Sequence, residues 1–424
     1  MKKINLVALI SILIGTVLEW YDFSLIASMA PIMSLLFFPS KEKIISLLVT
    51  YGVFASGFLM RPIGAMIFGH IGDKYGRNIA LSMTIVLMVL PTTLMGLLPT
   101  FNQIGILAPI TLIILRLVQG IASSGEYPGA ICYLTEIAPK GKRGLWGSIS
   151  MFGVVGGVLL GSIVNSLLLT VLSTDQLYSW GWRIPFLVGL PLGVMGLILR
   201  YRVQESQLFE KMKLRKKVLE KPLKNLVVFN YKNVTKVISL FSLSTISFYM
   251  SFVYIGNYLV NEKKISLSDV LLSNSISTVF LIFLIPLFGF LSDKIKRKYL
   301  MLAGTCSLII FYYPIFNLFL SNHFSGLLFG QILIAISIAM LVGPMAATVS
   351  EMFPTSVRYS GVSAGLNFGA SFFGGTSPFV ATYLVQCTLK ESIPAIYPIL
   401  FALICFFVIM SIKDEQSRVF AEND

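Results

Sequence analysis

The sequence has few charged residues, few cysteines and few histidines. Asp, Glu, Lys and Arg make up 12% of its 424 residues, about half the share found in soluble domains. Apolar residues reach 56% and mean hydropathy is +0.83, so polar groups cannot cover the exterior of a water-soluble fold. The composition excludes a soluble enzyme, a nucleic-acid-binding protein and a disordered chain. A polytopic membrane protein remains.

The four cysteines form no disulfide or metal-binding pattern. They lie singly in apolar segments, at Cys132, Cys306, Cys387 and Cys405, so we expect small buried side chains, with no metal and no cofactor. A GxxxxGK[ST] motif is absent, which disfavours an ATP-driven pump. A ring-forming filter segment is also absent, which disfavours a channel.

Apolar runs of membrane-spanning length are abundant. At about 20 residues per span, the sequence predicts an all-α polytopic membrane protein with twelve transmembrane helices in the lipid bilayer. We expect a monomer. The predicted spans are 6–36, 45–70, 79–98, 104–134, 147–171, 181–200, 236–260, 270–291, 299–320, 325–349, 360–386 and 394–412.

Lys and Arg are distributed unevenly between the two sides that these spans define. With a cytoplasmic N-terminus, 25 of the 33 lie in cytoplasmic segments and 6 in outer loops, while Arg61 and Arg116 lie within spans. This asymmetry predicts a plasma (bacterial inner) membrane protein with both termini in the cytoplasm. It accounts for the net charge of +14 without nucleic acid. Trp180 and Trp182 are then expected at the outer interface, where indole rings are enriched.

The stretch 201–233 is the one long connection, and it divides the chain. We predict an N-terminal six-helix bundle over 1–200, a cytoplasmic linker over 201–233 and a C-terminal six-helix bundle over 234–424. The linker contains the basic run 211–217. This run either contacts inner-leaflet lipid or is a solvated linker that follows the positive-inside rule.

Three sequence elements recur in both halves in the same order. GHIGDKYGR at 69–77 is matched by GFLSDKIKR at 289–297. A Glu-x-x-Pro element followed by Arg recurs, and so does a series of glycines four residues apart. These repeats predict two similar bundles. The glycines, which allow close helix crossing or form a sliding seam, are Gly153, Gly157 and Gly161, then Gly361, Gly365 and Gly369.

The repeated loop elements place opposite charges on the cytoplasmic side. Each loop Asp can cap a neighbouring helix or pair with Arg. We expect these pairs to close the cytoplasmic side and to break when it opens, with simple loop anchoring as the alternative. The expected network contains Asp73, Arg77, Glu136 and Arg143 in one half, and Asp293, Arg297, Glu351 and Arg358 in the other.

Five ionisable side chains lie within the first-half spans: Glu19, Asp22, Arg61, Arg116 and Glu126. Such groups are costly in hydrocarbon and usually face a cavity or a partner. From a rise of about 1.5 Å per residue, we expect one layer of Glu19 and Asp22 with Arg116, and a second layer of Arg61 with Glu126. Permanent pairs that only fix helix packing are the alternative.

These layers suggest a link between substrate and proton. A buried acid near an arginine is balanced between desolvation, which favours its neutral form, and attraction, which favours its charged form. The fork of Arg116 suits a substrate carboxylate, and its occupation would let Asp22 or Glu19 bind a proton. We expect Arg61 and Glu126 to complete the substrate site.

The second-half spans offer uncharged polar groups instead. Tyr254, Asn257 and Asn367 are predicted to bind substrate, and Asn274 and Gln331 are further polar residues of these spans. A tyrosine face can receive an ammonium group. The first half is therefore expected to handle charge, while the second half shapes the pocket.

Several of these segments resemble the major facilitator superfamily, namely the 69–77 loop, RLVQG at 116–120 and the duplicated Glu/Pro/Arg elements. GTVLEWYDF at 15–23, RPIGA at 61–65, Gln119-Gly120 with Gly125-Glu126, and GWRIPF at 181–186 resemble its metabolite:proton symporter family. The resemblance implies a transporter and not an enzyme. Members take up proline and betaines, 2-oxoglutarate, citrate or shikimate with protons.

Together these features predict proton-coupled uptake of a small carboxylate-bearing metabolite by alternating access of two bundles. Three intramembrane acids against two arginines slightly favour a zwitterion over a dicarboxylate. An organic-anion exchanger or effluxer on the same fold is one alternative. A non-transporting membrane sensor is another.

Overall fold

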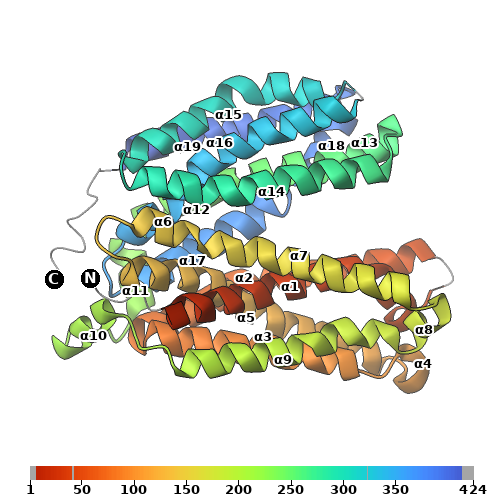
Figure 1. Cartoon of the computed structure of the whole chain (residues 1–424), viewed down its shortest axis with the longest axis horizontal. Helices are drawn as coiled ribbons and strands as arrows, with labels where there is room; N and C mark the ends of the chain where they lie inside the picture. Colours follow the sequence, from red (N-terminus) through yellow and green to blue (C-terminus); the bar gives the residue numbers. More distant parts are fainter. Residues whose placement is uncertain (1–5, 41–42, 322, 413–424) are drawn as a thin grey trace. The chain divides into compact units, whose positions relative to one another are not determined.

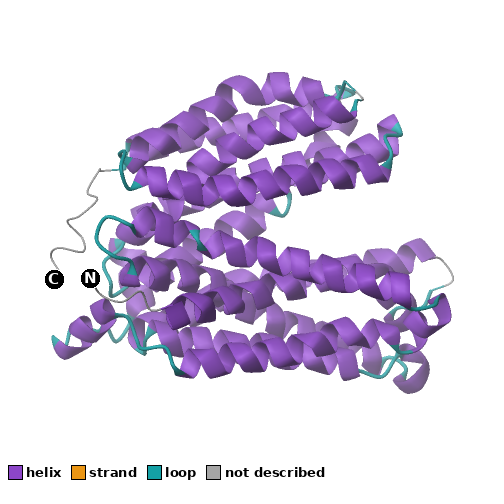
Figure 2. Ribbon diagram, viewed as in Figure 1, coloured by secondary structure: helices purple, strands orange, loops and turns teal. Residues whose placement is uncertain are grey.

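The computed structural model describes residues 6–40, 43–321 and 323–412. This part of the chain is built from helices, without a strand (Figure 2). Ten of its helical segments are long and apolar enough to cross a membrane. The other two predicted spans are helical as well, and they are α2 and the segment from α17 to α18. The predicted all-α polytopic fold is confirmed.

The helices follow the predicted spans closely (Figure 1). Short helices in the connections are α4 (Phe101–Ile104), α8 (Thr174–Ser179), α10 (Gln207–Leu214) and α11 (Pro222–Phe229). The spans of the first half are α1 (Leu6–Phe37), α2 (Lys43–Lys74), α3 (Arg77–Leu97), α5 (Leu107–Ile137), α6 (Arg143–Ser148) with α7 (Ser150–Val171), and η1 (Gly181–Arg183) with α9 (Ile184–Tyr201). Those of the second half are α12 (Tyr231–Phe248) with η2 (Tyr249–Tyr254) and α13 (Ile255–Lys263), α14 (Leu267–Ser292), α15 (Arg297–Phe319), α16 (Phe324–Glu351), α17 (Arg358–Gly369) with η3 (Ala370–Gly374) and α18 (Ser377–Thr388), and η4 (Ile393–Ala395) with α19 (Ile396–Met410).

Contacts between residues divide the chain into two compact units. The first unit contains 1–133 and 150–223, and the second contains 134–149 and 224–424. The short segment 134–149, which holds the end of α5 and all of α6, thus packs with α14 and α16 of the second unit. The predicted domain boundaries at residues 200 and 234 do not anticipate that 134–149 packs with the second unit. These boundaries stay a prediction.

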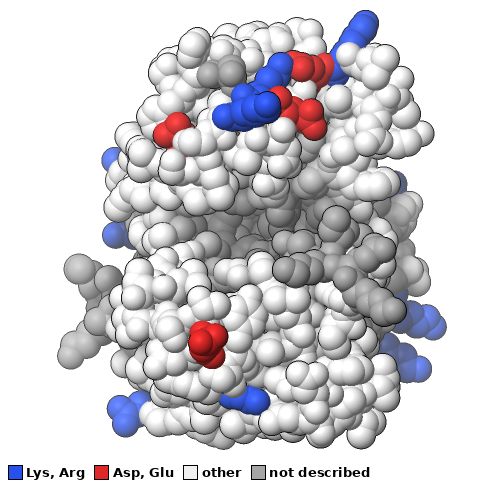
Figure 3. All heavy atoms as spheres, turned by 90° about the vertical axis from the view of Figure 1, so that its right-hand side faces the viewer, with Lys and Arg blue, Asp and Glu red and all other residues white. Residues whose placement is uncertain are grey.

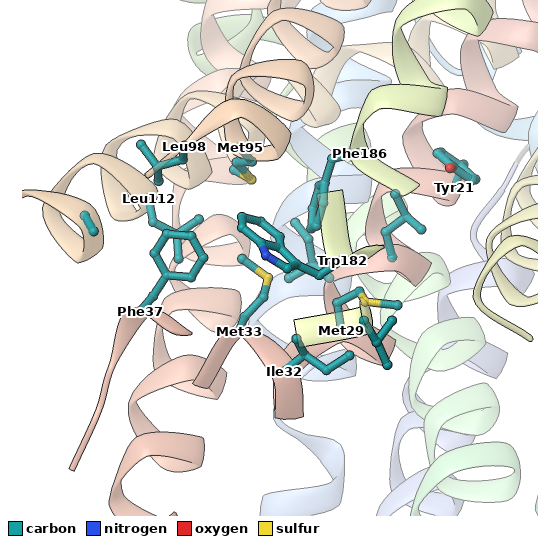
Figure 4. Close-up of a cluster of buried hydrophobic side chains, with 14 residues drawn as sticks. Tyr21, Met29, Ile32, Met33, Phe37, Met95, Leu98, Leu112, Trp182 and Phe186 are labelled. Carbon is teal, nitrogen blue, oxygen red and sulfur yellow. The ribbon is translucent and has the colours of Figure 1, made fainter. Parts of the chain in front are cut away.

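A large apolar cluster in the first unit joins α1, α3, α5 and α9 (Figure 4). Trp182 is fully buried in it, and its ring lies 5.4 Å from that of Phe37 and 6.3 Å from that of Phe186. The expectation that Trp182 faces the membrane interface is therefore wrong, because the η1 turn directs its ring into the core. Trp180 is 49% exposed, as an interfacial side chain would be.

The glycine series lie at close helix crossings in both units. A Cβ atom at Gly157 of α7 would stand 2.7 Å from the backbone nitrogen of Tyr21 on α1. In the second unit, a Cβ at Gly365 of α17 would overlap Val237 of α12. The predicted close crossings are present, while a role as a sliding seam stays a prediction.

The long connection is partly folded. In α10, Leu208, Phe209 and Met212 are buried in the first unit. The ring of Phe209 lies 5.0 Å below the Arg77 guanidinium. Lipid contact and solvation remain alternatives for its basic residues. Figure 3 views the molecule toward the ends of its helices, where a few Lys, Arg, Asp and Glu side chains lie among uncharged ones.

Candidate functional site

A cavity within the first unit gathers four of the five ionisable side chains predicted inside spans. It is lined by Glu19, Asp22, Arg61 and Arg116. Phe23, Phe58 and Gln119 are among the other lining residues. In the described part of the chain, no group of three or more His, Cys, Asp or Glu could hold a metal ion.

The first acid–arginine pair in the cavity joins α1 to α5. Asp22 Oδ2 lies 3.6 Å from Arg116 Nη1, and both side chains are buried. Thr92 and Gln119 each donate a hydrogen bond to Asp22 Oδ1, at 2.7 and 2.9 Å. Gly57 of α2 leaves room for the guanidinium, since a Cβ there would stand 3.0 Å from Arg116 Nε. Of the predicted layer of Glu19 and Asp22 with Arg116, the Asp22–Arg116 pair is present, whereas Glu19 pairs with Arg61.

The second pair joins α1 to α2. Arg61 Nη2 donates to Glu19 Oε1 at 3.3 Å, and the Arg61 guanidinium lies 5.0 Å from the centre of the Phe58 ring. Phe58 meets Phe23 edge to face, with ring centres 5.4 Å apart. The cavity therefore combines two buried ion pairs with two aromatic rings. A ligand with a carboxylate at one end and a cation at the other suits such a lining.

The expected pairing of Arg61 with Glu126 is wrong, because Glu126 has another partner. Its Oε1 accepts a hydrogen bond at 2.9 Å from Nη2 of Arg200, near the end of α9. Thr84 donates to the other carboxylate oxygen. Glu126 is fully buried and is not among the residues that line the cavity, so the geometry does not support its predicted contact with substrate.

Arg200 is the functional candidate that sequence reasoning missed. It is one of the 25 Lys and Arg that the sequence assigns to cytoplasmic segments, yet it is 1% exposed and completes a third buried pair. Arg200 directly follows the apolar run 184–199, and this position is the sequence feature that could have indicated a place inside the span. An arginine in the last turn of a span can fold back along its helix and meet an acid there.

The charged loop of the first unit forms one buried pair. Arg77 Nη1 lies 3.4 Å from Asp73 Oδ1 and also donates to the carbonyl oxygen of Gly72 at 2.8 Å. Gly76, between them, has φ +124°, which a side chain would disfavour. Glu205, which we did not predict, accepts from the backbone nitrogen of Asn78 at 2.9 Å and thereby ties the start of the linker to this loop.

The second unit contains most of the expected network, with different partners. Arg358 Nη1 donates to Glu136 Oε1 at 2.7 Å, and Arg143 Nη1 lies 3.7 Å from Glu351 Oε1. These pairs connect the two halves of the sequence, whereas we expected pairs within each half. The reason is that 134–149 belongs to the second unit.

In the second repeated loop, 289–297, the aspartate makes the contacts that the sequence predicts. Asp293 accepts hydrogen bonds from the backbone nitrogens of Gly144 and Leu145, at 2.7 and 2.9 Å, and so caps α6. Arg297 pairs with Asp293 at 3.6 Å and also with Glu351. Both expected uses of a loop aspartate, capping and pairing, are present here.

The predicted pocket residues of the second unit have diverse surroundings. Tyr254 is buried and stacks on Tyr258, with ring centres 5.9 Å apart. Asn257 is exposed, and Asn367 donates to the Ser363 carbonyl of its own helix at 2.9 Å. The residues that line the first-unit cavity all belong to that unit. Substrate binding by these three side chains stays a prediction.

Gln331 and Asn274 have a structural task in the second unit. Gln331 Nε2 donates to the Ser251 carbonyl, and Asn274 Nδ2 donates to that of Phe252, both at 3.0 Å. These carbonyls belong to the π-helical segment η2, where the regular helical pattern of hydrogen bonds is interrupted. The two amides therefore stabilise an irregular turn.

Comparison with known proteins agrees with this architecture. Residues 7–227 match the family model described as Sugar (and other) transporter, and residues 237–422 match that of the Major Facilitator Superfamily. The chain is 32% identical over 414 residues to the proline/betaine transporter of Salmonella typhimurium, covering 96% of this chain and 83% of the relative. It is 31% identical to the glycine betaine/proline/ectoine/pipecolic acid transporter of Dickeya dadantii, covering 96% and 82%.

Among solved structures, the fold is similar to that of a proton:xylose symporter. The TM-score is 0.79, and the alignment covers 95% of this chain and 94% of the symporter. At 17% sequence identity, this likeness shows the fold alone.

Proposed function

The chain belongs to the major facilitator superfamily of membrane transporters, and from this premise we propose that it takes up a small carboxylate-bearing metabolite together with protons. The observation that carries the proposal is the first-unit cavity, in which two buried acids face two arginines. Such pairs are costly in a membrane and are tolerated at sites of binding or proton transfer.

Arg116 is the proposed ligand of the substrate carboxylate. Its guanidinium faces the cavity and can offer parallel N–H donors to a carboxylate. A substrate bound there competes with Asp22 for the same positive charge. Asp22 lies 3.6 Å away and is buried, so losing that attraction favours its neutral form. Substrate and proton therefore bind together, because each makes the other's site more favourable.

A zwitterion is the proposed substrate class. With Arg200 included, the buried acids and arginines are equal in number, so the sequence argument from an excess of acids no longer holds. The lining favours a zwitterion on different grounds, since Phe23 and Phe58 line the cavity together with Glu19 and can receive a substituted ammonium group. The names of the relatives, which mention proline and betaines, favour the same class.

Alternating access would use the charged network of the second unit. Glu136 with Arg358 and Arg143 with Glu351 tie the end of α5 and α6 to α16 and α17. Opening this face requires these pairs to separate, and closing it restores them. Asp73 with Arg77 anchors the corresponding loop of the first unit. Anchoring without gating is the alternative for both sets.

The proposed orientation places these charged loops and both termini in the cytoplasm of a plasma membrane. It rests on the excess of Lys and Arg in the connections, although Arg200 no longer counts among them. The termini themselves, 1–5 and 413–424, lie outside the described residues.

Uptake into liposomes tests the proposal. Purified protein is reconstituted, and entry of labelled proline, glycine betaine and citrate is measured with and without an acidic exterior. We expect a pH gradient to drive accumulation of a zwitterion, and Asp22→Asn to remove that dependence. Asp175→Asn, an exposed acid of the same unit, is the control. Exchange without a pH effect would favour the anion exchanger, and the absence of any flux would favour a sensor.

A further inference from the structure

Three buried ion pairs lie in series along one face of α1. Positions 15, 19 and 22 share this face because they are four and three residues apart. Asp22 meets Arg116 and Glu19 meets Arg61, while Gly15 lies against the pair of Glu126 and Arg200. From Asp22 to Gly15 the series extends about 10 Å along the helix.

Glu126 extends the row of buried acids, Asp22 and Glu19, beyond the cavity. A side chain at Gly15 would overlap the Glu126 carboxylate, so this acid lies one helical turn from Glu19. Around Glu126, Thr84 of α3 and Arg200 of α9 donate to its carboxylate, and α1 approaches it at Gly15, one turn from Glu19.

Arg200 marks the far end of the series. The next residue, Tyr201, ends α9 and is 89% exposed, so the pair lies at the end of this span. Arg200 Nε and Nη1 are buried and have no hydrogen-bond partner in the protein. A buried N–H without a partner is costly, and water is small enough to satisfy such groups.

We propose that Glu126 is a second proton-carrying residue, which receives the proton from Glu19 and releases it to water at the Arg200 end. In the transfer, protonated Glu19 and ionised Glu126 become ionised Glu19 and protonated Glu126. The proton then leaves to water, and Arg200 stabilises the carboxylate that remains. The cavity holds the substrate, whereas this buried pair gives the proton a separate exit. The inference rests on the proposed proton-coupled uptake.

The variant Glu126→Gln tests this route, because glutamine keeps the shape and still accepts from Arg200 and Thr84 but carries no proton. Labelled proline or glycine betaine is followed in liposomes, first under a pH gradient and then in counterflow against unlabelled substrate. We expect gradient-driven uptake to fall by about 100-fold or more, while counterflow, which needs no net proton release, falls far less. Equal loss of both fluxes, or retention of both, would overturn the proposal.

Thr84→Val gives an independent readout if Glu126→Gln does not fold. Thr84 donates to the Glu126 carboxylate, so its removal disfavours the ionised form. The pH of half-maximal driven uptake then moves upward. Thr93→Val on the same helix is the matched control, since Thr93 bonds the Val89 carbonyl of its own helix. An unchanged pH profile for Thr84→Val would contradict the relay. If wild-type protein shows no gradient-driven uptake, the proposed function itself fails.

Discussion

In the first unit, three ion pairs lie inside the spans, where each carboxylate and each guanidinium is removed from water: Asp22–Arg116, Glu19–Arg61 and Glu126–Arg200. In the second unit, the described ion pairs lie at helix ends or in loops. Its central polar network is neutral and is centred on Gln331, which bonds Ser251, Ser273 and Asn274.

The difference assigns separate tasks to the two units. A buried ion pair can change its protonation state when a ligand competes for one partner. A neutral amide network cannot do so at ordinary pH, and it instead holds an irregular backbone in place. The first unit therefore has groups suited to coupling. The second unit has a fixed π-helical turn and a set of pairs at its helix ends.

The largest effect should follow from breaking a first-unit pair. Arg200→Ala leaves Glu126 buried without its cation, and removal of one partner of a buried pair costs about 3–5 kcal/mol. We expect a large fall in the thermal unfolding midpoint of protein in detergent. The double variant Glu126→Leu with Arg200→Met should recover most of it, because no uncompensated charge remains. Failure to recover would show that the cost comes from packing.

A smaller effect is expected at the end of α5. Glu136→Gln weakens the hydrogen bond from Arg358, and bonds to charged groups contribute about 1.5–3 kcal/mol. The unfolding midpoint should fall accordingly. Lys142→Gln, an exposed residue of the same loop, is the control and should behave as wild type. If the Glu136→Gln protein were as stable as wild type, the Glu136–Arg358 pair would not belong to the network proposed to close the cytoplasmic side.

Within the neutral network, Gln331→Leu leaves the Ser251 carbonyl without its donor. An unsatisfied buried group of this kind costs about 1–3 kcal/mol, and thermal unfolding should report it. Asn257→Ala is the comparison within the same unit, because Asn257 is exposed. If both variants unfolded at the same temperature, Gln331 would not hold the π-helical turn.

The smallest effect concerns an exposed pair. Lys263 Nζ lies 2.8 Å from Glu391, and this hydrogen bond holds the Glu391 pKa below its ordinary value. Such a lowered pKa stabilises the fold above the ordinary value of 4.5, and the contribution is lost as pH falls. Glu391→Gln should cost about 0.2–1 kcal/mol at neutral pH. Unfolding curves of variant and wild type should converge in acid, and a constant gap would argue against the pair.

The sequence predicted the spans, the acid–arginine pair of Asp22 and Arg116, and the capping role of Asp293. Hydrophobic runs determine helix positions directly, and residues at similar depth on neighbouring spans tend to meet. It did not predict the partners of Arg61 and Glu126, because depth alone does not tell which helices adjoin. Nor did it predict that 134–149 packs with the second unit, since the hydrophobic pattern of a short segment does not indicate which helices it packs against.

The central claim is that Arg116 binds the carboxylate of the substrate. Thermal shift of purified protein with proline, glycine betaine and citrate tests it most directly, because a ligand at about 100 times its Kd stabilises the folded state by about 2.7 kcal/mol. We predict that Arg116→Gln abolishes the shift given by the best ligand, while Arg202→Gln, an exposed arginine, retains it. An undiminished shift in Arg116→Gln would contradict the account.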